Sequence, residues 1–156
     1  MPKISKYFTL NEALFSMMAK RKKIDNTPSK EILEKIIYFA MNTADKIREL
    51  FGAFSPSSWF RCEKLNKAVG GSATSDHKFG EAIDFNIFGL TIEEIMIKII
   101  ESGIIFDQLI NEFDSWVHIS ARKNLPNRKQ VFKLYYREGK LVKEFYRVKD
   151  GKLAIN

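Results

Sequence analysis

The order of two periodicities along the chain predicts an α+β fold. Helix signals fill the first third of the sequence, and alternating residues typical of strands dominate after residue 82, interrupted by one further helix. Because helices come first and mostly antiparallel strands later, we expect N-terminal helices packed on a mostly antiparallel sheet. A length of 156 residues with 45% hydrophobic content is enough for one domain with its own core, spanning residues 1–156.

Capping residues mark the expected helices. Thr9-Leu10-Asn11-Glu12 and Thr91-Ile92-Glu93-Glu94 both have the pattern of a capping box. Thr27-Pro28 places a proline at the first position of a longer helix, which ends at Gly52 near a left-handed cap position. We therefore expect helices at residues 10–20, 28–51 and 92–102, with one or two helical turns at residues 63–69.

Strands are expected where apolar and polar residues alternate. Side chains two residues apart share a face, so Asp84 lies on the face of Ala82, and His118 on the face of Trp116. Hairpin turns are expected at Asp114-Ser115 and at Glu138-Gly139. The strands are predicted at residues 82–87, 106–113, 116–120, 131–137 and 141–148.

Charge and cysteine content limit the classes of partner and compartment. The formal net charge of +7 indicates either an anionic partner or simply a soluble surface. Candidate partners are an anionic cell-wall polymer, acidic lipid and nucleic acid; the last is disfavoured because only the short cluster Arg21-Lys22-Lys23 supports it. One cysteine, Cys62, excludes an internal disulfide framework. No apolar run approaches the roughly 20 residues of a membrane helix, so no membrane insertion is expected.

The two histidines of the chain suggest a metal site. His77 precedes the strand that carries Asp84, and His118 lies on a later strand. Two imidazoles and one carboxylate leave a fourth position open, which is the ligand count of a catalytic zinc site. A closed structural site would need four protein ligands, usually including cysteines. We therefore expect one Zn²⁺ per chain, with Ser75 hydrogen-bonding within the loop to help fix the His77 ring.

The arrangement Ser-x-His-x-x-Gly-x-Ala-x-Asp followed by Trp-x-His resembles the zinc D-Ala-D-Ala carboxypeptidase and L-Ala-D-Glu endopeptidase family, in its short, phage-type branch. The resemblance covers roughly residues 8–120 and leaves a C-terminal hairpin extension, residues 121–156, without an assigned motif. Further matching segments are Ile24-Asp25-Asn26-Thr27-Pro28, Arg61 with Leu65-Asn66, Val69-Gly70-Gly71-Ser72 and Phe106-Asp107-Gln108-Leu109-Ile110.

The resemblance implies roles for individual residues. Family zinc ligands correspond to His77, Asp84 and His118. Arg61 corresponds to an arginine that anchors the substrate carboxylate or the developing oxyanion, for which a planar guanidinium is suited. We place Ser75 with Arg61 in the expected substrate site.

The general base is not settled by the resemblance. Many relatives carry an acidic residue three positions before the second zinc histidine, where this chain has Ser115. The neighbouring acids are Glu112 and Asp114. We favour Glu112, because it lies on the strand almost opposite Val117, whereas Asp114 would lie at the turn in solvent; Asp114 is kept as the alternative base.

The function implied is zinc-dependent hydrolysis of peptide bonds in peptidoglycan stem peptides, as in phage endolysins that degrade the cell wall. A non-catalytic, zinc-retaining wall-binding or virion structural domain is the alternative that Ser115 keeps open. A third hypothesis is a basic nucleic-acid-binding protein. The start Met1-Pro2-Lys3-Ile4-Ser5 lacks an apolar secretion segment, so we expect synthesis in the cytoplasm and action on the wall after release or as a virion component.

Overall fold

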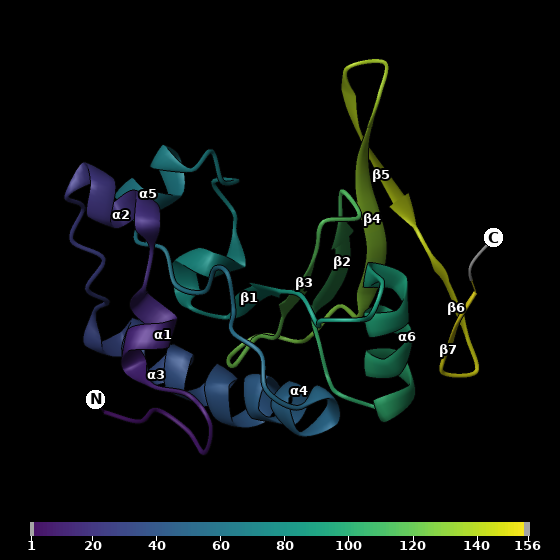
Figure 1. The fold of residues 1–156 in the computed structure, drawn as a ribbon, viewed down its shortest axis with the longest axis horizontal. Helices are drawn as coiled ribbons and strands as arrows, with labels where there is room; N and C mark the ends of the chain where they lie inside the picture. Colours follow the sequence, from purple (N-terminus) through teal and green to yellow (C-terminus); the bar gives the residue numbers. More distant parts are fainter. Residues whose placement is uncertain (1, 155–156) are drawn as a thin grey trace.

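The computed structural model describes residues 2–154 and has the predicted α+β class (Figure 1). Five strands form one sheet in the order β1-β3-β2-β4-β5, and β6 and β7 form a separate small hairpin. The strands are β1 Ala82–Phe85, β2 Gln108–Glu112, β3 Trp116–Ser120, β4 Gln130–Arg137, β5 Lys140–Phe145, β6 Arg147–Lys149 and β7 Lys152–Ala154. Strand pairs in the main sheet are antiparallel except β2 with β4, which is parallel.

Helices surround one face and one edge of this sheet. They are α1 Leu10–Leu14, α2 Met17–Lys22, α3 Lys30–Phe39, α4 Asp45–Phe51, α5 Glu63–Ala68 and α6 Ile92–Ser102. A π-helical segment, Ala40–Ala44, joins α3 to α4, and a 3₁₀ turn, Asp76–Phe79, precedes β1. Figure 1 shows α6 beside the sheet and α3 and α4 beneath it. Within the described residues, no helix is long and apolar enough to span a bilayer.

The core lies between the helices and one face of the sheet. Inward-facing residues of β1, β2 and β3, such as Phe85, Leu109 and Val117, are fully buried there. From the helices come Ile36, Phe39, Ile47, Ile95, Met96 and Ile99. Since side chains alternate along a strand, the polar residues between these positions point to the opposite face, on which the candidate site is built.

Both expected capping boxes are present, but other helix boundaries differ from the prediction. The hydroxyls of Thr9 and Thr91 accept bonds from the third helical N–H, and the glutamates bond back. The expected helix at 10–20 is two helices, because Ser16 adopts an extended conformation and caps α2. Pro28 lies before the cap of α3, where the Ser29 side chain accepts from the Ile32 N–H. Gly52 ends α4 with φ +84° and ψ −158°, outside the left-handed helical region.

Several strand boundaries were also predicted wrongly. β1 ends at Phe85 and β5 at Phe145, because the chain then turns away from the sheet. A further turn at Asp150 and Gly151, both with positive φ, produces the unpredicted β6–β7 hairpin. The β2–β3 turn is centred on Phe113 and Asp114, not on Asp114-Ser115, since the Ser115 N–H donates to the Glu112 carbonyl at 2.9 Å.

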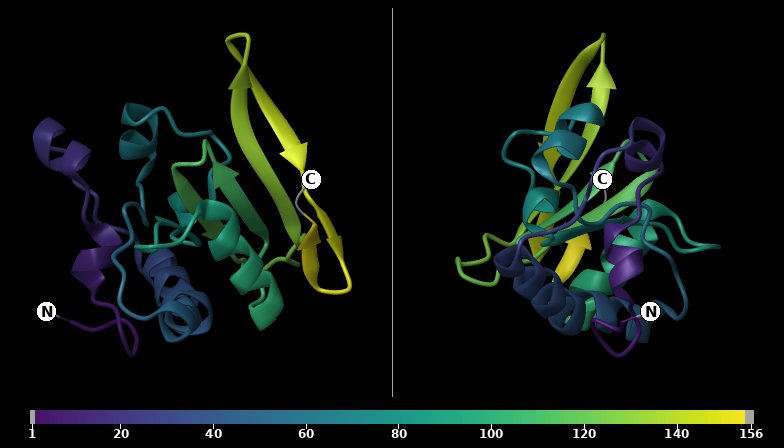
Figure 2. Two further views of the ribbon diagram at one scale, coloured as in Figure 1. Left: turned by 45° about the vertical axis from the view of Figure 1, so that its right-hand side comes forward. Right: turned by 90° about the vertical axis from the view of Figure 1, so that its left-hand side faces the viewer.

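The C-terminal extension joins the sheet through a buried carboxylate. Asp107 has no exposed side-chain surface and forms ion pairs with Arg122 at 3.2 Å and Arg128 at 2.7 Å. The Arg128 N–H also donates to this carboxylate, and the Gln130 N–H donates to the Asp107 carbonyl. These bonds hold β4 in its parallel pairing with β2. The β4–β5 hairpin extends beyond the ends of β2 and β3 (Figure 2).

Candidate metal centre

Three potential metal ligands converge on the face of the sheet opposite the core. Asp84 on β1 pairs directly with His118 on β3, so the two side chains lie side by side. His77 reaches the same place from the 3₁₀ turn before β1. One ligand atom from each of the three residues lies within 4.8 Å of the others, and all three residues are buried.

The two distances from Asp84 to the histidines are close to those between ligands of a tetrahedral metal ion. Oδ1 of Asp84 lies 3.2 Å from Nε2 of His77 and 3.0 Å from Nδ1 of His118. Ligand atoms at about 2.0–2.1 Å from a tetrahedral zinc ion lie about 3.3 Å from one another. The residues therefore fit zinc in ligand type, number and spacing.

Backbone contacts fix the orientation of the His77 ring. Nδ1–H of His77 donates to the carbonyl of Trp59 at 2.6 Å, which leaves Nε2 free to face Asp84. The Ser75 hydroxyl accepts from the His77 N–H and caps the turn, as expected. Gly80 closes the turn with φ +70°, and a Cβ there would lie 2.2 Å from the Ile36 side chain. Residues other than glycine are therefore excluded on both conformational and steric grounds.

Burial and charge set the protonation of the cluster. Burial lowers the pKa of His77, which favours the neutral imidazole that binds a metal. Burial alone would raise the pKa of Asp84, but the two histidines outweigh it and hold the pKa well below its usual value. Burial opposes the charged form of His118, yet the hydrogen bond and charge of Asp84 raise its pKa. Asp84 therefore remains an anion between the two rings.

Glu112 lies at the edge of this cluster. It pairs with Trp116 rather than lying opposite Val117, so it belongs to the same face as His118. Its Oε1 lies 3.6 Å from Nδ1 of His118. Burial is the largest influence on Glu112 and raises its pKa, while the positive charges of His118 and Arg61 oppose this shift. A carboxylate with a raised pKa beside the ligands has the properties of a general base.

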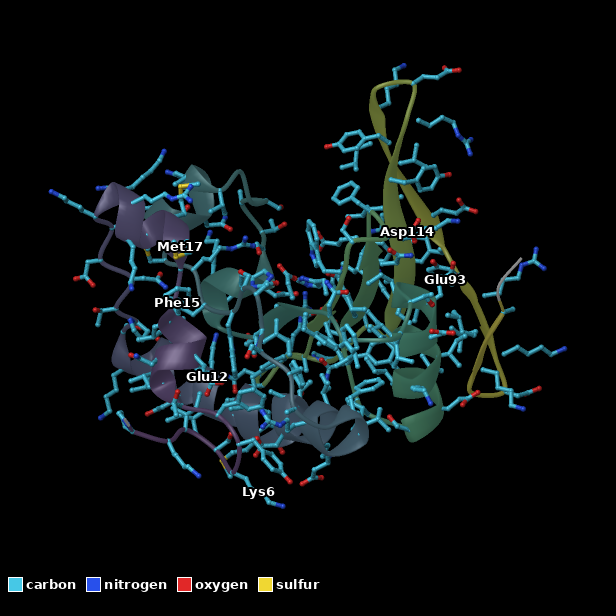
Figure 3. The ribbon with its side chains drawn as sticks, viewed as in Figure 1. Lys6, Glu12, Phe15, Met17, Glu93 and Asp114 are labelled. Carbon is cyan, nitrogen blue, oxygen red and sulfur yellow. The ribbon has the colours of Figure 1, made fainter. Side chains whose placement is uncertain are left out.

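Asp114 lies away from the cluster. It occupies the β2–β3 turn with φ +53°, and its carboxylate accepts a hydrogen bond from the Asn111 side chain at 2.7 Å. Asn111 faces the core side of the sheet, and Asp114 lines a surface cavity together with Glu93 of α6 (Figure 3). Ser115 donates its hydroxyl to the Phe113 carbonyl within the same turn.

Arg61 lies beside the 3₁₀ turn that carries His77. The backbone N–H of Arg61 donates to the His77 carbonyl at 3.0 Å. Nη2 of its guanidinium donates to the Ser75 hydroxyl at 3.3 Å. Its Nε is buried without a hydrogen-bond partner. Burial lowers the pKa of the guanidinium, and the carboxylates of Asp84 and Glu112 oppose that effect. Arg61 thus places a positive charge near the carboxylates of Asp84 and Glu112.

Two contributors to the site were not predicted. The buried Asn26 side chain donates to the Phe60 carbonyl and accepts from the Cys62 N–H, so it holds the residues on both sides of Arg61. Asn26 lies in the segment 24–28 that matches the family, and this is the sequence signal that could have identified it. The second is Trp116, which pairs with Glu112 across β2 and β3 and whose buried indole N–H opposes the rise that burial causes in the pKa of that carboxyl.

A comparison with models of protein families gives a match. A family model described as Peptidase M15 matches residues 6–120, which include every residue of the cluster and end where β3 ends. The comparison with curated proteins found no match.

Proposed function

The chain belongs to the peptidase M15 family of zinc-dependent metallopeptidases that act on peptidoglycan, and on that premise we propose its reaction and site. We infer that one Zn²⁺ per chain binds to His77, Asp84 and His118, and that the protein hydrolyses peptide bonds in peptidoglycan stem peptides. The bond is of the D-Ala-D-Ala carboxypeptidase or L-Ala-D-Glu endopeptidase type. The observation that carries this proposal is the convergence of two histidines and one aspartate, with Oδ1 of Asp84 within 3.2 Å of a ring nitrogen of each histidine.

The surrounding residues would divide the remaining tasks. Bound zinc would polarise the scissile carbonyl and lower the pKa of water at the open position. Glu112 would accept the proton of the attacking water and pass it to the leaving amine, since it lies within reach of the ligands. Arg61 would bind the substrate carboxylate or the developing oxyanion through its planar guanidinium, whose Nη2 is held by the Ser75 hydroxyl.

Glu112 is the reason for preferring catalysis over a non-catalytic zinc-retaining domain. Ser115 has no carboxylate and is bonded within its turn, which supports the non-catalytic alternative. The neighbouring strand nevertheless supplies a carboxylate 3.6 Å from His118. From the resemblance to the phage-type branch, we further propose that the protein acts in cell-wall lysis as an endolysin or virion-borne enzyme.

Purified peptidoglycan and defined muropeptides test this proposal. We expect peptide hydrolysis that a chelator abolishes and added zinc restores, and mass spectrometry of the products identifies the bond. Wall binding without any cleavage at saturating zinc would support the non-catalytic alternative. Nucleic-acid binding that depends steeply on salt and is indifferent to zinc would support a different class of protein.

A further inference from the structure

The sheet face that carries the metal ligands continues onto the C-terminal hairpin. Glu112 on β2 pairs in parallel with Leu134 on β4, and Leu134 pairs with Lys143 on β5. Paired residues project to the same side of a sheet. His118, Glu112, Leu134 and Lys143 therefore lie along one surface, which we call the site-side face. Adjacent strands are about 4.8 Å apart, so β4 lies about 10 Å from β3.

Apolar and charged residues of the hairpin are segregated between its two faces. On the hairpin, the site-side face carries one charge, Lys143, and five apolar or aromatic residues of β4 and β5, which are Phe132, Leu134, Tyr136, Leu141 and Phe145. Phe113 from the adjoining turn packs against them. The opposite face of the hairpin tip carries Lys133, Arg137, Lys140 and Glu144. The site-side face is therefore adapted to a ligand with little charge.

Three aromatic rings connect the metal centre to the hairpin. Trp116 packs edge-on against Phe113, with ring centroids 5.9 Å apart. Phe113 in turn stacks on Tyr136 at 5.4 Å and an interplanar angle of 10°. We call Trp116, Phe113 and Tyr136 the aromatic strip. Phe113 has φ +60°, a conformation that is costly for a bulky residue, so the fold holds this ring in the strip against a local preference.

The described chain leaves much of this face uncovered. Tyr136 is 65% exposed, Leu141 57% and Phe145 55%. Adjoining exposed apolar residues on a projecting hairpin are typical of an interaction site (Figures 1 and 2). Pairing with a second copy through the free edge of β5 is disfavoured, because Lys140 and Lys143 lie on that edge strand.

We propose that the aromatic strip binds the glycan strand to which the stem peptide is attached. This inference rests on the proposed function and extends its substrate beyond the peptide. Pyranose rings present uncharged C–H faces that pack on the electron-rich faces of aromatic rings. A peptide spans about 3.3–3.6 Å per residue, so about three residues of stem cover the 10 Å between the metal ligands and β4.

Binding of a peptide-free glycan tests the strip independently of catalysis. The probe is the uncharged tetrasaccharide of N-acetylglucosamine, which has the sugar rings of the glycan without stem peptides or free carboxylates, titrated calorimetrically into the zinc-loaded protein. We expect Tyr136→Ala to weaken binding about five- to tenfold and Tyr136→Phe, which keeps the ring, to retain it. Tyr135→Ala is the matched control, because Tyr135 is the adjacent residue on the opposite face and bonds to Glu144.

The outcomes separate this inference from the proposed reaction. Tetrasaccharide binding that falls in Tyr136→Ala alone supports the strip, even if no peptide bond is cut. No binding to the wild-type protein, or equal loss in the Tyr135 and Tyr136 variants, would overturn it, whatever the peptidase activity. Binding of soluble polyphosphate but not of the tetrasaccharide would also overturn it, in favour of a purely electrostatic wall contact.

Discussion

Glu112 and His118 lie on neighbouring strands, are not paired with each other, and still bring Oε1 and Nδ1 to 3.6 Å. The β2–β3 register pairs Glu112 with Trp116, two residues before His118, so the contact is diagonal across the sheet. Diagonal neighbours on one face are within reach of long side chains. This relationship places a carboxylate beside the proposed metal ligands, which Ser115, three residues before His118, cannot do.

We predict that Glu112→Gln loses turnover while Asp114→Asn does not. The substitution at Glu112 keeps the shape of the side chain and removes the proton acceptor, so kcat should fall about 10²–10⁴-fold with the zinc content unchanged. Asp114 bonds to Asn111 in the turn, so Asp114→Asn should leave kcat nearly unchanged. Steady-state kinetics on one stem peptide, with metal analysis of each variant, makes the comparison. A large loss only in the Asp114 variant would reverse the assignment, and full activity in both would exclude either acid as the base.

We predict that lysine cannot replace Arg61. Lysine keeps the charge but loses the planar guanidinium, and a lost charge-assisted hydrogen bond costs about 1.5–3 kcal/mol. Catalytic efficiency should then fall by roughly one to two powers of ten in Arg61→Lys and Arg61→Ala. An anchor for ground-state substrate would mainly raise KM, whereas an oxyanion donor would mainly lower kcat. Unchanged kcat and KM in both variants, at equal zinc content, would assign Arg61 a structural role.

Local sequence signals predicted the parts of the fold that depend on neighbouring residues. The capping boxes at Thr9 and Thr91, and the shared face of Trp116 and His118, need only residues close in the chain. The pairing of Asp84 with His118 also agrees with the expected convergence of two strands. The position of His77 before β1 follows from the short spacing to Asp84.

Features that depend on distant residues were not predictable in the same way. The parallel pairing of β4 with β2 is stabilised by Asp107 and Arg128, which are far apart in sequence. Phenylalanine at a positive φ contradicts its local preference, so the sequence alone misplaced the turn at Phe113. The carbonyl of Trp59 that orients His77 is a backbone group, which no residue type reveals.

We predict that Asp107→Asn destabilises the fold in a pH-dependent way. Burial raises the pKa of Asp107, but the hydrogen bonds from Arg128 and the charges of Arg122 and Arg128 lower it below the usual value. Because the pKa of Asp107 is lower in the folded state, its ionised carboxylate stabilises the fold. This stabilisation is complete above the unfolded-state pKa of about 3.9, and it is lost as the pH falls through the folded-state pKa. Removing this charge should cost about 3 kcal/mol at pH 7.

Urea unfolding at pH 7 and at acidic pH measures this effect. The wild-type and Asp107→Asn free energies of unfolding should converge as the pH falls below about 4. Glu144→Gln is the control, because Glu144 forms a long, exposed pair with Lys133 at 3.8 Å and should change stability by less than about 1 kcal/mol. Equal effects of the two substitutions at pH 7 would show that Asp107 does not anchor the extension.

We predict that salt weakens attachment to whole walls without affecting cleavage of a small peptide. Residues 121–156 contain 11 Lys and Arg against 3 Asp and Glu, a net charge of +8, so the first 120 residues carry a net charge of −1. Exposed charges are screened beyond about 8–10 Å near physiological ionic strength. Raising the salt concentration should reduce co-sedimentation with walls and leave soluble-peptide hydrolysis nearly constant. If salt reduced wall co-sedimentation and soluble-peptide hydrolysis equally, electrostatic attachment to the wall would be ruled out.

The zinc content of the His118→Ala variant tests the central claim most directly. We predict one zinc ion per wild-type chain by elemental analysis of protein purified without added metal, because three potential ligand atoms lie within 4.8 Å of one another. The variant should retain little zinc and, since His118 is also buried, its folding should be checked by circular dichroism. Loss of zinc from a folded variant is the expected result, and undiminished zinc in that variant would contradict the assignment of the metal centre.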